Sequence, residues 1–499
     1  MNRRFTLTLL AVLLFMGASP VVFADTSDQL VSALDGVKQQ LAKMQQTIDQ
    51  QNLRIQQLES NKVLEVPQAN APIQPSAAAS SMSEADWQKG IKDNIGEAIP
   101  WLKGAKYGGD FRLRMENFEY YDKNNDAGST GTAADRTRNR FRIRLRWGFE
   151  KDYGDDWKVG FRLATGQPSS TSGIATDNTS PNQTLGNPGY FVFKNIWIDR
   201  AYANYSPNGL KDYGIIKGVT IGAGKFENPF LRYSTPMVWD ADVTPEGAYE
   251  KANLQFVSTE DTKVNFYATS GQFIVNENTG VNTDGEMYGY QGALNVSIYG
   301  FHTDMPVGIT GAVSYYDYPG WSQTIASNTA GVSFLRTNTI VADNFRVLDI
   351  YPEVQFYVDR TPVTLWYDYA KNLGNVGTED IAQSLENDIH DKDTAWGFGV
   401  KAGNPKKKGD WGFSYGYYVI GANSVVAAFN DSDFGGPGQV GATNRQGHKF
   451  GVAYKLTDNI EVDWTGYVVR PLNPNPSSIL ASSTNESVFR SQADLVYKF

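Results

Sequence analysis

The most distinctive candidate chemistry in this sequence is a row of arginines at every second position. From Phe141 to Trp147 the chain alternates strictly between apolar and arginine residues. In an extended strand, residues two apart share a face, so the guanidinium groups would lie on one face and the apolar groups on the other. Like charges at neighbouring positions repel. Such a row is tolerable where water fills the space beside it, and is better tolerated if carboxylates lie nearby.

The usual parts of an enzyme active site are scarce. Cysteine is absent, which excludes a disulfide scaffold, a cysteine-ligated zinc site and a thiol nucleophile. Three histidines occur, His302, His390 and His448, and no two have metal-ligand spacing. We therefore expect no catalytic residues, no cofactor and no metal. The formal charge of −9, which becomes −11 when a leader carrying two arginines is removed, excludes nucleic acid as a partner.

The residues before 106 predict four segments outside the main domain. Arg3 and Arg4, an apolar run and a small-residue ending at Ala24 predict a signal peptide over residues 1–24. Apolar residues at alternating steps of four and three predict a coiled coil over residues 25–62, although a single amphipathic helix lying on another surface has the same pattern. A Pro/Ala/Ser linker follows over residues 63–82, and a short helix with its lead-in over residues 83–105.

From Lys106 to Phe499 the apolar period changes to two, in segments of about ten residues. Seven short and eight long connections interleave, which gives fifteen connections and hence sixteen strands. An even number of strands with both ends on the short-turn side is typical of an outer-membrane barrel. We therefore predict an all-β fold: a transmembrane antiparallel β-barrel over residues 106–499, preceded by the α-helical coiled coil. The short turns would be periplasmic and the long loops extracellular.

The period also assigns faces. Apolar and aromatic positions are predicted to face lipid, and their Gly, Ser, Arg, Glu, Asp and Gln neighbours to face inward. The predicted lipid-facing residues include Phe111, Leu113, Met115, Trp157, Ile350, Val354, Phe398, Trp411, Phe413, Tyr415 and Tyr417. A barrel of sixteen strands is too wide for its own side chains to fill. We therefore expect an aqueous channel whose polar inner face needs no buried partner.

Three stretches resemble the bacterial outer-membrane porins, and in particular the putative porin family with an N-terminal periplasmic coiled segment. They are residues 109–114 followed by 138–146, residues 224–230, and residues 239–242 followed by 245–247. The resemblance implies passive diffusion of small hydrophilic solutes or ions, and a homotrimer. It also implies a bacterial outer-membrane location with the N-terminal segment in the periplasm. The implied partners are outer-membrane lipid and lipopolysaccharide, with cell-wall contact through the coiled coil as a further option.

In such a protein the working parts are the groups that narrow and charge the lumen. The predicted pore-lining residues are Arg112, Arg114, Arg138, Arg140, Arg142, Arg144, Arg146, Arg162, Asp349, Glu353, Asp368, Glu461 and Asp463. Since the last strand pairs with the first, Glu461, Asp463 and Asp494 are expected near the arginines, and Asp349, Glu353 and Asp368 across the pore. These charges either create a transverse field or brace the wall through ion pairs, and both roles stay open.

By analogy with other porins, the third long loop, residues 227–245, is predicted to fold inward as a constriction. Its candidate residues are Glu227, Phe230, Arg232, Tyr233, Trp239, Asp240 and Asp242. Asp431 and Asp433 imitate part of a calcium loop, but the full spacing is missing, so we expect a solvated loop there.

Two other functions remain as alternatives. The barrel could merely anchor an adhesion or envelope-tethering protein, in which case a smaller, plugged barrel would suffice. An outer-membrane phospholipase would need a Ser-His pair facing lipid, whereas His448 is expected on the inward or rim phase without a partner. The sequence predicts weak ion selectivity, with a mild anion preference as the second choice, and does not name the solute.

Overall fold

In the computed structural model, the described residues are 104–121, 136–154, 156–166, 178–187, 189–230, 235, 237–277, 284–299, 305–320, 338, 344–374, 393–435, 442–472 and 487–499. The chain divides into two compact units, Met1–Asp86 and Trp87–Phe499, and every described residue belongs to the second. The predicted signal peptide, coiled coil and linker, and nearly all of the predicted short helix, lie outside the described residues.

The described part of the chain contains seventeen strands and two short 3₁₀ helices. The strands are β1 (Lys106–Tyr121), β2 (Arg136–Tyr153), β3 (Trp157–Thr165), β4 (Gln183–Thr184), β5 (Ile196–Tyr205), β6 (Ile216–Lys225), β7 (Glu246–Ser258), β8 (Thr262–Asn276), β9 (Gly285–Ile298), β10 (Val307–Pro319), β11 (Asn344–Val358), β12 (Thr361–Asn372), β13 (Thr394–Gly403), β14 (Trp411–Ile420), β15 (Arg445–Lys455), β16 (Ile460–Pro471) and β17 (Ser487–Lys498). The 3₁₀ helices are η3 (Asn208–Leu210) and η4 (Ser432–Phe434). Among these residues no helix is long and apolar enough to cross a membrane.

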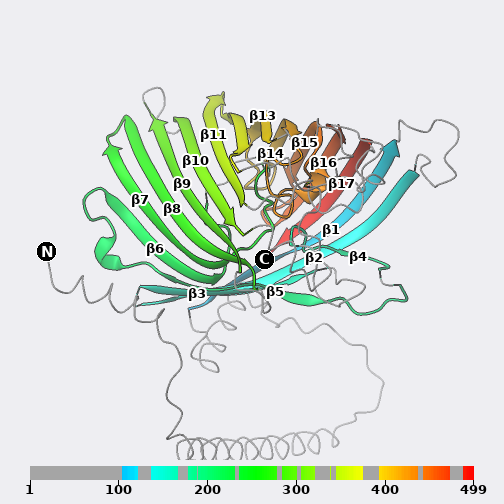
Figure 1. The fold of residues 1–499 in the computed structure, drawn as a ribbon, viewed down its shortest axis with the longest axis horizontal. Coiled ribbons are helices and arrows are strands. Elements are labelled where there is room, and N and C mark those ends of the chain that lie inside the picture. The colour runs from blue at the N-terminus through cyan, green and yellow to red at the C-terminus, as the bar shows by residue number, and fades with distance from the viewer. Residues whose placement is uncertain are drawn as a thin grey trace, which may run out of the picture. The chain divides into compact units, whose positions relative to one another are not determined.

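Sixteen of the strands form one closed antiparallel ring, as predicted (Figure 1). Each strand pairs with the next along the chain, and β17 pairs with β1 in a register that places Arg114 opposite Asp494. Phe499 exchanges two backbone hydrogen bonds with Gly109, which seals the seam. The two-residue β4 was not predicted. It belongs to the loop after β3 and pairs with β2 beside Arg142, where the short β3 has already ended.

The two faces of the ring differ as the period of two predicts. On β2 the side chain of Phe141 is 52% exposed, whereas that of its neighbour Arg142 is 6% exposed. Phe111, Ile350, Phe398 and Trp411 lie on the same exposed outer face. The pleat produces this alternation because successive side chains point to opposite faces of a strand. The apolar outer face is the surface that lipid would cover.

The inner face differs from the expectation of an entirely polar lining. A hydrophobic core lies within the ring, built from inward side chains of β7 to β14 and of β16, and from the loops after β6 and β14. Tyr316, Phe345, Trp366 and Tyr418 are among its buried members. The period of two located these positions on the inner phase, but it could not reveal that loops would cover them. Part of the lumen is therefore packed protein rather than water.

Candidate functional site

The inward arginines of β1, β2 and β17 form one cluster, which we call the arginine sector: Arg112, Arg114, Arg140, Arg142, Arg144, Arg146 and Arg490. Glu116 of β1 lies at its centre with a fully buried side chain. Its carboxylate accepts hydrogen bonds from Arg490 at 2.6 Å, from Arg140 and from the Gln492 amide at 2.9 Å. One carboxylate therefore links guanidinium groups from two different strands.

Two further strand carboxylates hold the rest of the row. Asp494 on β17 accepts two hydrogen bonds from Arg114, both at 2.7 Å, in the two-pronged geometry that guanidinium and carboxylate favour. Asp110 on β1 accepts from Arg144 at 2.9 Å and from Arg146 at 2.6 Å. These inward arginines are therefore closely paired with carboxylates, which supports the interpretation that the charges brace the wall.

The described residues of the seventh long loop, 421–435 and 442–444, pack inside the ring and contact the arginine sector through η4. Asp433 accepts hydrogen bonds from Arg490 at 2.7 Å and from Arg114 at 3.1 Å. Burial alone would raise the pKa of Asp433, but the guanidinium groups of Arg490 and Arg114 hold that pKa well below its usual range. The expectation of a solvated loop at Asp431 and Asp433 is therefore wrong, because these carboxylates have cationic partners inside the ring; Asp431 pairs with Lys449 at 2.9 Å.

The second long loop covers the two arginines that lack a close carboxylate. Asn182 accepts a hydrogen bond from Arg112 at 2.5 Å through its side chain and one from Arg142 at 3.4 Å through its carbonyl. The Ser180 hydroxyl accepts from Arg142 at 3.2 Å. The nearest carboxylate oxygens lie 3.7 Å from Arg112 and 3.8 Å from Arg142. Neutral oxygens from the loop thus accept hydrogen bonds from the guanidinium groups of both arginines.

The described residues of the third long loop fold into the ring and pack against the opposite wall. The ring of Phe230 lies edge-on to Phe273 and Tyr316, and a Cβ built on Gly289 would approach the Phe230 ring to 2.3 Å. Only a glycine at this position of β9 leaves room for the loop. Trp239 packs edge-on to Tyr316 and stacks on Phe429 of the seventh loop, with centroids 5.3 Å apart.

The remaining residues predicted on this loop have separate surroundings. Asp242 reaches the arginine sector, 3.3 Å from Arg146. Asp240 is buried beside Asp431 and Asp242, and burial followed by these like charges raises its pKa well above the usual range. Glu227 pairs with Arg200 at 2.8 Å. The other two candidates, Arg232 and Tyr233, lie outside the described residues.

The inward aromatic side chains on the other side of the ring form a second cluster, the aromatic sector: Phe273, Tyr316, Tyr318, Phe345, Tyr351, Trp366, Tyr418 and Tyr467. They pack on one another and on the loops, for example Trp366 on Tyr418 and Tyr418 on Phe434. All of them are buried. The third and seventh loops therefore contact both sectors, and the backbone N–H of Asp240 joins the two loops by donating to the Phe429 carbonyl at 2.6 Å.

The other predicted pore-lining residues do not gather at one place. Arg138 is exposed near the start of β2, and Arg162 pairs with Asp199 of β5. Glu461 pairs with Lys455 at 2.9 Å rather than with an arginine. Asp463 lies opposite Asp494 in the β16–β17 register. Glu353, Asp349 and Asp368 lie on β11 and β12, away from the arginine row, and Thr235 of the third loop contacts Asp368.

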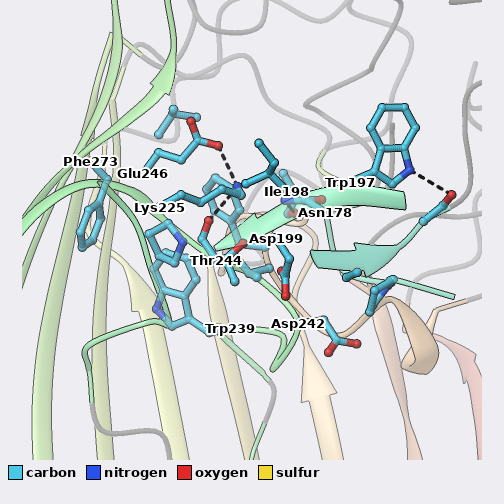
Figure 2. A pocket seen from close by; sticks show the side chains of 18 of the residues that line it. Asn178, Trp197, Ile198, Asp199, Lys225, Trp239, Asp242, Thr244, Glu246 and Phe273 are labelled. Carbon is cyan, nitrogen blue, oxygen red and sulfur yellow. Dashed lines mark hydrogen bonds and ion pairs between the residues drawn. The ribbon is translucent and has the colours of Figure 1, made fainter. Parts of the chain in front are cut away.

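Two of the cavities along the ring are lined by predicted pore or loop residues. One of about 400 Å³ is lined by the second, third and seventh loops and by the ends of β3 and β5, with Asp199, Asp242 and Trp239 among its residues (Figure 2). At its edge Lys225 donates to Glu246 at 2.7 Å and to the Thr244 carbonyl at 3.2 Å. The other, of about 670 Å³, lies toward the short-turn end of β11 to β17. Its charged lining residues are Glu353, Lys401, Asp463 and Asp494.

Sequence reasoning missed one arginine of the arginine sector, Arg490, and three of the residues that accept hydrogen bonds from the sector: Asp110, Asn182 and Asp433. Arg490 has the same inward phase on β17 as Gln492 and Asp494, so the period of two could have found it. Asp110 shares the phase of Arg112 in the same way. No local signal marked Asn182, and the pattern around Asp433 indicated a solvated loop, because the roles of both residues depend on where two long loops fold.

His448 also differs from its predicted place. It lies on the outer phase of β15, and its Nδ1 is 2.9 Å from the Tyr415 hydroxyl. Its ring also packs against Tyr417 and Phe450. The expectation of an inward or rim position without a partner is therefore wrong. The contacts around His448 are aromatic and phenolic. Within the described ranges, no group of three or more His, Cys, Asp or Glu side chains is arranged to hold a metal ion.

Comparisons with known proteins give one family match. The model of the family described as putative porin matches residues 92–338 and 323–468. Among solved structures, OprB of Pseudomonas putida at high pH is 11% identical with a TM-score of 0.47, over 83% of this chain and 97% of that one. OmpF of Salmonella typhi in complex with daunomycin is 12% identical with a TM-score of 0.40, over 79% and 98%. No curated protein matches the chain.

Proposed function

The chain belongs to the putative porin family, and we propose that it is an outer-membrane channel through which small hydrophilic solutes or ions diffuse passively. The observation that carries this proposal is the closed ring of sixteen strands with an apolar outer face and charged groups on part of its inner face. A ring of this size is too wide for its wall side chains to fill, so a water-filled passage remains unless loops block it completely.

The proposed passage runs beside the inward loops, through the cavity near Asp199 and Asp242 and on to the cavity near Lys401 and Asp463. The third loop would be its constriction, together with parts of the second and seventh loops. Seven guanidinium groups of the arginine sector face five carboxylates, Asp110, Glu116, Asp242, Asp433 and Asp494. The acidic residues that line both cavities oppose this excess of positive charge, which supports weak ion selectivity, with a mild preference for anions as the second choice.

The assembly and location follow from the family and are part of the proposal. A homotrimer in the bacterial outer membrane would expose the apolar outer face to lipid and lipopolysaccharide. The N-terminal segment would extend into the periplasm, where its coiled coil either trimerises or reaches the cell wall. Cross-linking of the native protein, with and without residues 25–62, distinguishes these two roles.

Purified protein in a planar lipid bilayer tests the channel function. Stable, ohmic single-channel steps are the expected result, and a silent membrane at saturating protein contradicts the proposal. In a salt gradient, the reversal potential then gives the sign of the selectivity. Replacing Arg142 and Arg144 by glutamine should shift that potential toward cations, because the positive excess disappears. An unchanged potential would leave both arginines with the bracing role alone.

A further inference from the structure

Two carboxyl groups beneath the third loop lie in direct contact. Asp349 of β11 and Asp368 of β12 are on the same face of adjacent strands, offset by two residues in register. Their side chains are within hydrogen-bonding distance of each other. Asp368 is 2% exposed, and the Oδ1 atom of each residue is buried without a hydrogen-bond partner. Sequence reasoning placed both residues on the pore wall, whereas the structure places Asp368 in contact with a loop and Asp349 beside Asp368.

The groups around this pair are neutral. The Ser314 hydroxyl hydrogen-bonds Asp349 and in turn accepts a hydrogen bond from the Gln291 amide at 3.0 Å. The titratable groups that face the pair are Tyr316 of β10 and Tyr418 of β14. Among the described residues, no lysine or arginine forms an ion pair with either carboxyl group. Asp368 is buried and Asp349 is partly buried with a buried Oδ1 atom, and two such adjacent carboxylates without a counter-charge cannot both stay ionised.

One contact connects this pair to the third loop. The Thr235 hydroxyl donates a hydrogen bond to Oδ2 of Asp368. A hydrogen-bonded chain therefore runs along the inner wall from Gln291 through Ser314, Asp349 and Asp368 to the loop. Met237 and Trp239, two and four residues further on, are buried in the aromatic sector. The position of this stretch of loop thus depends on Asp368.

We propose that Asp349 and Asp368 are positioning residues that share one proton, and that this proton holds the third loop against the wall. With the proton present, one carboxyl donates to the other and Asp368 still accepts from Thr235. When the proton is lost to solvent at higher pH, two adjacent negative charges remain, and hydrating them requires the loop to move away. The inference deepens the proposed function, because it makes the constriction sensitive to pH, but its test does not require conduction.

The absence of cysteine allows a direct test by labelling. In the full-length chain, Met237→Cys places one thiol at a buried position of the loop. Its reaction rate with a water-soluble methanethiosulfonate is measured from about pH 6 to pH 9. The same reporter in an Asp349→Asn background is the matched control, since the amide donates to Asp368 without a titrating proton. The ratio of the two rates cancels the ordinary rise in thiolate with pH.

The expected rate ratio is near one at the acid end and rises on the order of tenfold at the alkaline end. Asp368→Asn should behave as Asp349→Asn does, and Thr235→Val should label fast at every pH. A ratio that stays at one, or a pH response that persists in both asparagine variants, overturns the proposal. If Met237→Cys does not fold, Val238→Cys provides a second buried reporter.

Two further measurements test whether another positive charge neutralises Asp349 and Asp368. If EDTA raises the labelling rate at acid pH to that of Thr235→Val, a divalent metal ion and not a proton holds the pair. If Arg232→Gln has that effect, the arginine supplies the charge. Either outcome overturns the shared proton. A silent bilayer with a pH-dependent labelling ratio would instead contradict the channel function and leave this inference standing.

Discussion

The arginine sector and the aromatic sector lie on different parts of the same inner wall and are covered by the same loops, yet they are stabilised in different ways. In the arginine sector most of the close contacts are directed, charge-assisted hydrogen bonds, such as those that Arg114 donates to Asp494. In the aromatic sector the contacts are ring packing, such as Trp239 on Phe429. The first depends on charge and geometry, and the second on volume and shape.

This difference has a consequence for the passage. A loop that packs on an aromatic wall excludes water, so we expect no solute to pass between the loops and the aromatic side chains that they cover. The charged side contains polar atoms that water can hydrate, and the cavity beside Asp242 borders it. The aromatic sector therefore fixes the loops, while the arginine sector provides the polar boundary. Substitutions in the two sectors should produce different kinds of defect.

The largest expected effect is the loss of Glu116. Glu116→Ala leaves Arg140 and Arg490 without their central carboxylate, and removing one partner of a buried ion pair costs about 4 kcal/mol in the free energy of unfolding. Urea unfolding of the folded barrel, followed by its shift in gel mobility, measures the change. Glu116→Gln is the control, since it keeps an acceptor and should cost less. Equal stability of Glu116→Ala and the unaltered protein would refute the network.

In the aromatic sector, Trp239→Ala should cost about 3 kcal/mol, because it removes a buried ring between Tyr316 and Phe429. Unlike Glu116→Ala, it should also loosen the third loop and increase the open-channel current noise. Trp239→Phe is the matched control and should restore most of the stability. Wild-type stability in Trp239→Ala would mean that the loop is not held by this contact.

A smaller effect is expected at Gly289. Gly289→Ala places a methyl group against the Phe230 ring, and such overpacking costs about 1–2 kcal/mol. The double variant Gly289→Ala with Phe230→Leu should recover part of this loss, because the shorter side chain makes room. A double-mutant cycle of unfolding free energies measures the coupling. Additive effects would show that the two residues do not contact.

The smallest effect concerns pH. Burial and the neighbouring Asp431 and Asp242 raise the pKa of Asp240, so the folded protein loses stability as pH rises above the unfolded value of a carboxyl group and toward this raised pKa. Asp240→Asn keeps the acceptor for the Asp242 N–H and should gain on the order of 1 kcal/mol at neutral pH. Unfolding curves at several pH values test this. An asparagine variant that is less stable at neutral pH would contradict the assignment.

Most of the wall was predictable from the sequence, because a period of two reports directly which side of a sheet a residue faces. Phe141 and Arg142 are the clearest example, and the count of sixteen strands followed from the interleaved connections. β4 was not predictable, since two residues carry no periodic signal. The inner aromatic core was also missed. Aromatic residues are common on strands of any half-buried sheet, so their presence did not indicate that loops would cover them.

The site was predictable only where strands form it. The inward arginines of β1 and β2 were found from spacing alone, and the pairing of the last strand with the first placed Asp494 beside them. Asn182, Asp433 and Thr235 reach their partners through long loops, whose paths depend on tertiary packing rather than on local sequence. The same limit explains why Asp349 and Asp368 were expected on an open pore wall.

The central claim is that solute passes beside the loops, through the cavity that Thr244 lines. The most direct test is single-channel current in Thr244→Cys before and after reaction with a bulky thiol reagent, with Gly209→Cys in a short turn as the control. Reaction at residue 244 should reduce the current, while reaction at residue 209 leaves it unchanged. An unchanged current after complete modification of residue 244 would show that the passage lies elsewhere.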